Sequence, residues 1–112
     1  MEKRVVITGL GAITPVGIGK ENFYNALLEG KSGIGPITRF DASDYATRIA
    51  GEVKDFDITQ YGVDKKEARR MDRSVEFAIG AAVLAADDAK LALDEEDLDR
   101  CGTVVGLSLI HI

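Results

Sequence analysis

The side chains that could carry out covalent chemistry are few in this sequence. Cys101 is the single cysteine and His111 the single histidine. A nucleophilic thiol needs a base or a positioned set of donors beside it, and Cys101 lies between Arg100 and Gly102 without such a partner. We therefore predict that Cys101 is a small packed or partly exposed thiol, and that these 112 residues hold no catalytic residue and no metal site.

A cluster of four cationic side chains is the best candidate for a binding function: Lys65, Lys66, Arg69 and Arg70. Side chains three and four residues apart lie on the same side of a helix, so the cluster predicts a positive patch on a chain whose net charge is -5. The alternative is an ordinary solvated face, or one whose cations pair with Glu67, Asp72 and Glu76. Both interpretations are open from the residues alone.

The glycines near the N-terminus raise a nucleotide-binding interpretation, which the spacing disfavours. The dinucleotide fingerprint requires glycine where this chain has Thr14, and the short-chain dehydrogenase spacing requires it at Ile13. Pro15 also removes an N–H where a phosphate-binding helix should donate one. We therefore predict that Gly9 and Gly11 serve backbone fit. A nucleotide-dependent reductase is a remote alternative, which NADPH binding would reveal.

The elements that must position these residues begin and end with short apolar runs. Residues 4–8 and 102–106 are rich in β-branched side chains and predict strands buried on both faces of a sheet. Residues 31–63 contain glycines, a proline and four scattered aromatic side chains, which predict an irregular segment with short strand or helix pieces. Structureless loops of that length are uncommon, so we expect an ordered functional or interface loop.

Three helices are predicted between the two runs. Residues 19–29 carry an apolar stripe followed by a glycine, and residues 73–93 carry a longer one. Asp64 and Glu67 have the spacing of a capping box, which predicts a helix through Met71 or into the next helix. The long helix has a second stripe of small side chains, which would let another backbone approach closely: Ala78, Ala81 and Ala85.

Composition and charge limit the class of protein. With 46% hydrophobic and 29% charged residues the chain is expected to fold. The net charge of -5 argues against a general nucleic-acid-binding protein. We find neither the apolar core of a signal peptide nor a run of about 20 apolar residues that would span a membrane. We therefore expect a soluble, cytoplasmic protein.

Four separated pieces of the sequence, in this order, resemble the N-terminal part of chain-elongating β-ketoacyl-acyl carrier protein synthases. They are residues 4–11 (RVVITGLG) with 15–17 (PVG), 27–34 (LLEGKSGI), 50–56 (AGEVKDF) and 69–73 (RRMDR). Each piece alone is weak, but their order and spacing make a specific match through Gly106. The resemblance implies a thiolase-like α/β fold, with a mixed, mostly parallel sheet and covering helices. Residues 1–106 would be part of the first of its two pseudo-symmetric halves.

The resemblance also implies an activity, a decarboxylative Claisen condensation in fatty-acid elongation. In this family a cysteine takes the acyl chain, and two histidines bind the malonyl thioester and favour its decarboxylation. We expect these residues beyond position 112, so this chain alone would be inactive. No cofactor is implied. Acyl carrier protein is acidic, and family residues matching Lys66, Arg69 and Arg70 contribute to docking it, so we assign carrier-protein binding to these three and Lys65. Full-length relatives form homodimers.

The last six residues, LSLIHI at 107–112, depart from the Gly/Ser-rich stretch that the family has after Gly106. We expect them to be foreign to the gene, and we carry over no function to Leu109 or His111. The segment before them, as an incomplete domain, is expected to expose apolar surface and to aggregate when expressed alone. A polyketide-type ketosynthase or a non-catalytic chain-length partner is the alternative, which the residue at the nucleophile position would distinguish.

Overall fold

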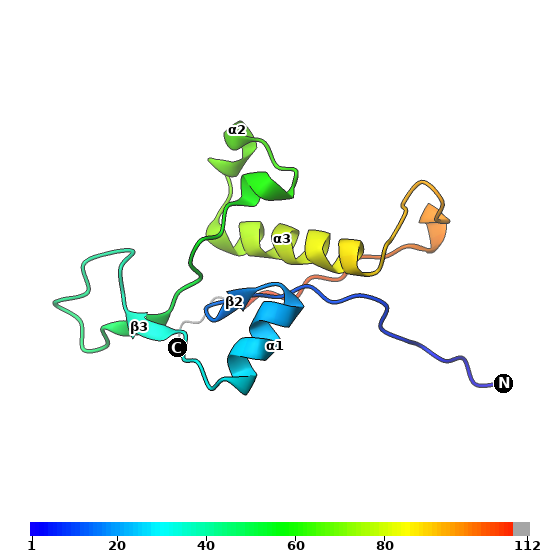
Figure 1. The fold of residues 1–112 in the computed structure, drawn as a ribbon. Coiled ribbons are helices and arrows are strands. Elements are labelled where there is room, and N and C mark those ends of the chain that lie inside the picture. Colours follow the sequence, from blue (N-terminus) through cyan, green and yellow to red (C-terminus); the bar gives the residue numbers. More distant parts are fainter. Residues whose placement is uncertain (109–112) are drawn as a thin grey trace.

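The computed structural model describes residues 1–108, which form a mixed α/β arrangement (Figure 1). In chain order the elements are β1 (Ile13–Thr14), β2 (Gly17–Ile18), α1 (Lys20–Leu28), β3 (Ile34–Pro36), β4 (Ile49–Gly51), the 3-10 helix η1 (Ile58–Tyr61), α2 (Lys65–Ala68), α3 (Arg73–Asp88) and the 3-10 helix η2 (Leu98–Arg100). Within the described residues, both sheets are two-stranded and antiparallel: β1 pairs with β2, and β3 pairs with β4. The predicted irregular segment is confirmed as short strands and a 3-10 helix.

A tight turn joins β1 to β2 and leads into α1. The Thr14 hydroxyl accepts a hydrogen bond from the Gly17 amide at 3.1 Å and donates one to the Gly17 carbonyl at 2.8 Å. Helix α1 then ends as predicted at a glycine, because Gly30 has φ 67° and the Lys31 amide bonds back to the Ala26 carbonyl at 2.9 Å. The left-handed conformation at this position costs little conformational energy for glycine, which has no Cβ atom.

The N-terminal segment packs closely on α3 through its glycines. A Cβ atom at Gly11 would overlap the Ala81 carbonyl oxygen, and one at Gly9 would overlap that of Ala85 and lie 2.7 Å from the Ala89 Cβ. Two residues of extended chain rise about 6.8 Å, and four residues of helix rise about 6 Å. Glycines two residues apart therefore match the spacing of alanines four residues apart on the helix. The predictions of backbone fit at Gly9 and Gly11 and of close approach to the alanine stripe are both confirmed.

Asp88 ties three segments together beside this contact. Its carboxylate accepts hydrogen bonds from the Leu10 amide at 2.9 Å and from the Lys20 ammonium at 2.6 Å. These bonds lower the pKa of Asp88 from its ordinary value. The hydrogen bond from the Lys20 side chain has the largest effect, and the one from the Leu10 amide comes second. The end of α3, the start of α1 and the N-terminal segment are therefore linked at one carboxylate.

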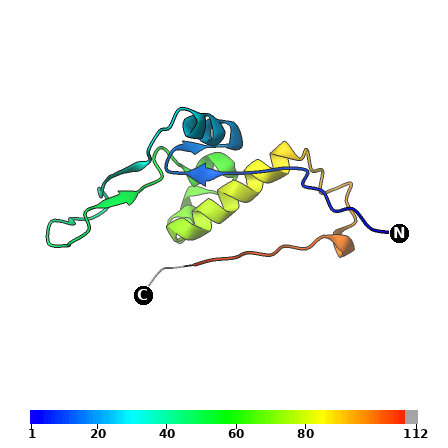
Figure 2. The ribbon, with the colours of Figure 1, turned by 90° about the horizontal axis from the view of Figure 1, so that it is seen from below.

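The structure assigns no strand to residues 4–8 or 102–106, where the sequence predicts buried strands. Val5 and Val104 are almost fully exposed, at 96% and 99%. A strand is defined by hydrogen bonds to a neighbour, and within residues 1–108 neither run has one. Both runs are nevertheless extended, and Figures 1 and 2 show residues 102–106 passing beside α3. Residues 4–8 continue beyond the C-terminal end of α3, which the chain meets at Gly9. The mostly parallel sheet expected from the resemblance does not form among the described residues.

Two helices are shorter than predicted. Helix α3 ends at Asp88, not at residue 93, because Lys90 takes a left-handed conformation with φ 53° and the Leu91 amide turns back to the Ala86 carbonyl. Helix α2 ends at Ala68, before the predicted Met71.

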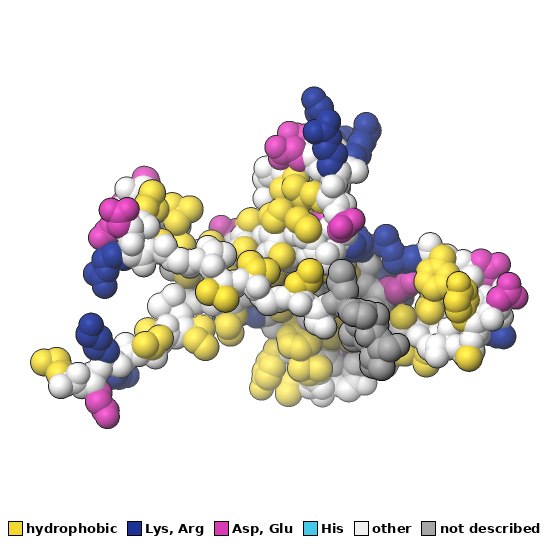
Figure 3. All heavy atoms as spheres, turned by 180° about the vertical axis from the view of Figure 1, so that it is seen from behind, with side chains coloured by type: hydrophobic (Ala, Val, Ile, Leu, Met, Phe, Trp, Pro, Cys, Tyr) yellow, Lys and Arg dark blue, Asp and Glu magenta, His cyan; other side chains and the backbone are white. Residues whose placement is uncertain are grey.

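Little of the apolar side-chain surface is covered within the described residues. The buried hydrophobic residues are Ala26, Ala42 and Ile58, whereas many large apolar side chains are exposed. Figure 3 shows such side chains spread over much of one face. The predicted exposure of apolar surface is confirmed. None of the helices among residues 1–108 has the length and apolar character needed to cross a membrane.

Candidate functional site

The four predicted binding residues lie together on a projecting lobe, here called the basic lobe and defined as residues 57–72. It contains η1, α2 and the turn into α3, and it stands away from the N-terminal end of α3 in Figure 1. The four residues are all exposed: Lys65, Lys66, Arg69 and Arg70. Figure 3 shows Lys and Arg side chains gathered at the far end of the projection above α3. The four residues are thus exposed on one lobe, and their joint binding function stays a prediction.

A capping residue begins helix α2, which carries Lys65 and Lys66, with Arg69 and Arg70 directly after it. The Asp64 carboxylate accepts hydrogen bonds from the amides of Lys66 at 2.7 Å and Glu67 at 3.0 Å. These bonds satisfy two of the amides that a helix start leaves unpaired, and the carboxylate also suits the positive end of the helix dipole. The predicted cap is thus confirmed, and it fixes the start of α2 at Lys65, the first of the four cations.

The four cations are not neutralised by ion pairs within residues 1–108. The sequence had suggested pairing with Glu67, Asp72 and Glu76, but Glu76 instead lies 3.6 Å from Arg73. A cation held in an internal ion pair is less available to a partner. The patch therefore presents its charge to solvent, which leaves open a solvated face or a binding surface.

A second acidic cap supports the lobe from below the patch. The Asp57 carboxylate accepts hydrogen bonds from the Thr59 hydroxyl at 2.7 Å and the Thr59 amide at 2.9 Å. The hydrogen bond from the Thr59 hydroxyl is the main cause of a lowered pKa of Asp57. The Thr59 amide and the charge of Lys65 lower this pKa further, by smaller amounts. Gly62, with φ 87°, ends η1 in the left-handed region and turns the chain toward α2.

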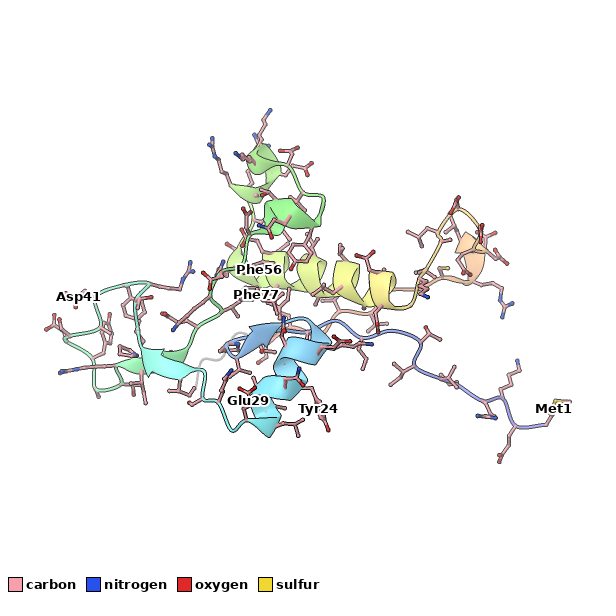
Figure 4. The ribbon with its side chains drawn as sticks, viewed as in Figure 1. Met1, Tyr24, Glu29, Asp41, Phe56 and Phe77 are labelled. Carbon is pink, nitrogen blue, oxygen red and sulfur yellow. The ribbon has the colours of Figure 1, made fainter. Side chains whose placement is uncertain are left out.

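An aromatic row and an arginine join the lobe to α3. The ring of Phe56 lies 5.5 Å from that of Phe77 on α3 and 5.4 Å from that of Tyr61 in η1. The Arg73 guanidinium lies 4.9 Å from the Phe77 ring centre and donates a hydrogen bond to the Val53 carbonyl at 2.9 Å. Phe56 and Phe77 face each other at the start of α3 in Figure 4.

These supporting residues were missed by reasoning from the sequence. Phe56 and Tyr61 read as scattered aromatics, and Arg73 only as part of the RRMDR piece. A signal was present, since Arg73 and Phe77 are one helical turn apart and can stack. The partner Val53 lies twenty residues away, and no local pattern predicts it.

The residues that could do covalent chemistry are not assembled into a site. Cys101 is exposed, and its sulfur lies 3.4 Å from the Asp97 carbonyl oxygen. Residues 1–108 contain no group of His, Cys, Asp or Glu side chains placed to hold a metal ion. Leu109 and His111 lie outside the described residues. What the described site can offer is a charged surface, not a reaction centre.

The segment described above, with its glycines packed on an alanine-lined helix and a cationic lobe at the start of that helix, has the fold of part of a ketosynthase structure. The solved structure titled "The ishigamide ketosynthase/chain length factor" is similar over 80% of this chain and 22% of that chain, with a TM-score of 0.70 and 38% identity.

The chain belongs to the beta-ketoacyl synthase family, because the family described as "Beta-ketoacyl synthase, N-terminal domain" matches residues 2–110. It is 55% identical over 108 residues to "3-oxoacyl-[acyl-carrier-protein] synthase 2" of Synechocystis sp., covering 96% of this chain and 26% of the relative. Proteins with the same name from Vibrio harveyi and Staphylococcus aureus are 48% and 47% identical, over 94% and 93% of this chain and 25% of each relative. The chain thus spans about a quarter of the length of these relatives.

Proposed function

We propose that this chain serves in a 3-oxoacyl-acyl carrier protein synthase that elongates fatty acids. The observation that carries the proposal is the 55% identity to a relative of that name over 96% of the chain. In this reaction a cysteine thiol displaces the carrier thiol from an acyl thioester, and malonyl-carrier protein loses carbon dioxide. The resulting carbanion attacks the acyl carbonyl, which forms the new carbon–carbon bond and releases the cysteine. Residues 1–108 supply scaffold and surface to this chemistry.

The basic lobe is the part of the chain that we assign to carrier-protein docking. Its support is geometric: four exposed cations on the short capped helix α2 and the turn that follows it, free of ion pairs within the described residues, on a chain whose net charge is -5. An acidic partner would be drawn to this patch and away from the rest of the surface.

The whole synthase is proposed to build a mostly parallel sheet around the extended runs. Residues 4–8 and 102–106 run in the same direction as each other and opposite to α3, as Figures 1 and 2 show, which is the order of directions in a strand–helix–strand unit. A cavity of about 460 Å³ is lined by residues 11–14, which follow the first run, by residues 105–107 and by side chains of α3. Strand partners from the remaining length of the relatives would complete the sheet. A homodimer in the cytoplasm is part of the same proposal.

A polyketide-type ketosynthase or chain-length partner is the second candidate, favoured by the ketosynthase/chain length factor structure at 38% identity. The residue at the nucleophile position of a complete gene separates both condensing enzymes from the non-catalytic chain-length partner. Cysteine there supports either condensing enzyme, and any other residue supports the non-catalytic partner.

The docking assignment is tested by reversing Lys66, Arg69 and Arg70 to Glu in a complete synthase carrying this segment. The KM for malonyl-carrier protein should rise by about tenfold or more at low salt, because each exposed charge contributes to steering and orientation. The salt dependence of binding should fall at the same time. The matched control reverses Lys3, Arg39 and Arg100, which are also exposed and lie outside the lobe, so that the net charge changes by the same amount. Equal KM values for the two triple variants would remove the assignment.

A further inference from the structure

Arg73 contacts both the segment that enters the basic lobe and the helix that leaves it. Its Nη2 donates to the Val53 carbonyl at 2.9 Å, across twenty residues of chain. Because Arg73 is the first residue of α3, this bond joins the start of the helix to the chain just before the lobe. The loop that carries the four cations is therefore closed at its base by one side chain, which limits the directions in which the lobe can point.

Stacking adds a second connection at the same place. The Arg73 guanidinium lies 4.9 Å from the ring centre of Phe77 and 5.9 Å from that of Phe56. Phe56 in turn contacts Tyr61, which lies inside the lobe. Cation–π and ring–ring contacts at these distances are attractive, so the row runs without a break from α3 through the arginine into η1.

The charge of Arg73 is used internally, unlike that of the four patch residues. Its guanidinium lies 3.6 Å from the Glu76 carboxylate, and its side chain is 31% exposed. The planar guanidinium can donate to a carbonyl, pair with a carboxylate and stack on a ring at once, which a lysine ammonium cannot do. Arginine at this position is thus suited to holding two chain segments and not to meeting a partner.

We propose that Arg73 is the positioning residue of the basic lobe. It fixes the lobe against α3, so that the four cations are presented to the acidic carrier in one orientation. This inference rests on the proposed docking function for its effect on the carrier. The fixing of the lobe itself rests on the contacts of Arg73 alone.

The test uses Arg73→Lys in a complete synthase, since lysine keeps the charge and removes the fork and the stacking. Amide hydrogen exchange in residues 57–72 should become about tenfold faster, as expected for the loss of one charged hydrogen bond and a cation–π contact. Exchange in the β3–β4 hairpin should not change. The KM for malonyl-carrier protein should rise several-fold while kcat at saturating carrier is kept. Phe56→Leu, which keeps apolar volume and loses the ring, should act in the same direction.

Arg48→Lys is the matched control. Arg48 also donates to a backbone carbonyl, that of Tyr45 at 3.1 Å, but in the hairpin loop outside the lobe. It should alter neither exchange in residues 57–72 nor the KM. A KM rise equal to that of Arg73→Lys would show a nonspecific effect and would overturn the inference.

The outcomes separate this inference from the docking assignment. Unchanged exchange in residues 57–72 of Arg73→Lys overturns the inference whatever the KM does. A loosened lobe with an unchanged KM also overturns it, provided that the triple Glu variant raises the KM. If the lobe loosens and the triple Glu variant leaves the KM unchanged, docking elsewhere is indicated, and the fixing of the lobe by Arg73 stands.

Discussion

Gly11 shows how a single missing methyl group sets the distance between two segments. A Cβ atom there would overlap the Ala81 carbonyl oxygen and lie 2.8 Å from the Ala85 amide nitrogen, and helix backbone cannot move aside as a flexible side chain can. Gly11→Ala in a complete synthase should therefore destabilise it by about 1–3 kcal/mol, the usual cost of overpacking. A lower midpoint of thermal unfolding is the expected measurement. Gly35→Ala is the control, since nothing lies within 4 Å of a Cβ atom at that position, and an equal loss in both variants would contradict the close approach.

Asp88 makes the same junction sensitive to pH. Hydrogen bonds from Lys20 first and from Leu10 second lower the pKa of Asp88 in the folded protein. The carboxylate therefore stabilises the fold above the ordinary pKa of an aspartate, and this contribution is lost as the pH falls through the lowered value. Asp88→Asn should reduce stability at neutral pH and match the unaltered protein in strong acid. Denaturant midpoints measured at both pH values check this, and a difference that persists unchanged in acid would refute it.

At the residue scale, the sequence was most informative where a local constraint acts. Gly9, Gly11 and the cap at Asp64 were predicted, because backbone fit and capping depend on residues a few positions away or on residue type alone. The contacts of Arg73 and Asp88 were not predicted. They join residues twenty and seventy-eight positions apart, and the sequence does not mark which carbonyl or amide a side chain will find.

At the scale of elements, helix ends were harder to predict than helix faces. The apolar stripe of α3 continues to Leu93 in the sequence, but the helix ends at Asp88 where Lys90 turns left-handed. A left-handed residue at a helix end is usually a glycine, and here it is a lysine. The sequence therefore did not predict that the helix ends at this position. Helix α1 has the same ending with Gly30, and its end was predicted.

Lys90 is accordingly a place where glycine should stabilise the protein. A lysine with φ 53° is strained relative to glycine, although glycine also gains more freedom in the unfolded chain. The net effect of Lys90→Gly should be about 0.5–1 kcal/mol of added stability. Asp87→Gly, within the last turn of α3, should have the opposite sign, since glycine weakens a helix. Chemical denaturation of both variants measures this, and destabilisation by both would argue against the left-handed turn.

The predictions of strands failed for a different reason than the predictions of helix ends. Residues 4–8 and 102–106 have the composition of buried strands and are extended, yet within residues 1–108 they lack a hydrogen-bonded neighbour. A helix satisfies its own backbone, whereas a strand is completed by another segment. Local pattern can therefore predict the conformation of such a run without predicting its pairing.

At the scale of the whole molecule, the described surface is unlike that of a self-contained domain. Within residues 1–108 the buried apolar side chains are those of Ala26, Ala42 and Ile58, while Val5, Ile7 and Val104 are 96%, 81% and 99% exposed. Burial of apolar area is the main stabilising term in folding, at about 25 cal/mol per Å². Exposed apolar runs with free backbone donors and acceptors also pair readily with other copies.

The 112-residue chain expressed alone should therefore bind an apolar dye and self-associate. Light scattering and size-exclusion chromatography should show species larger than a monomer at micromolar concentration, and unfolding should lack a cooperative transition. Val5→Lys with Val104→Lys should reduce the association, because charge on exposed edges opposes pairing. Leu91→Lys with Leu98→Lys is the control, placing the same charges on exposed apolar residues outside both extended runs. A monodisperse monomer that unfolds cooperatively would show that residues 1–112 bury enough apolar surface to fold alone. Exposed apolar surface would then no longer support the sheet proposed for the complete synthase.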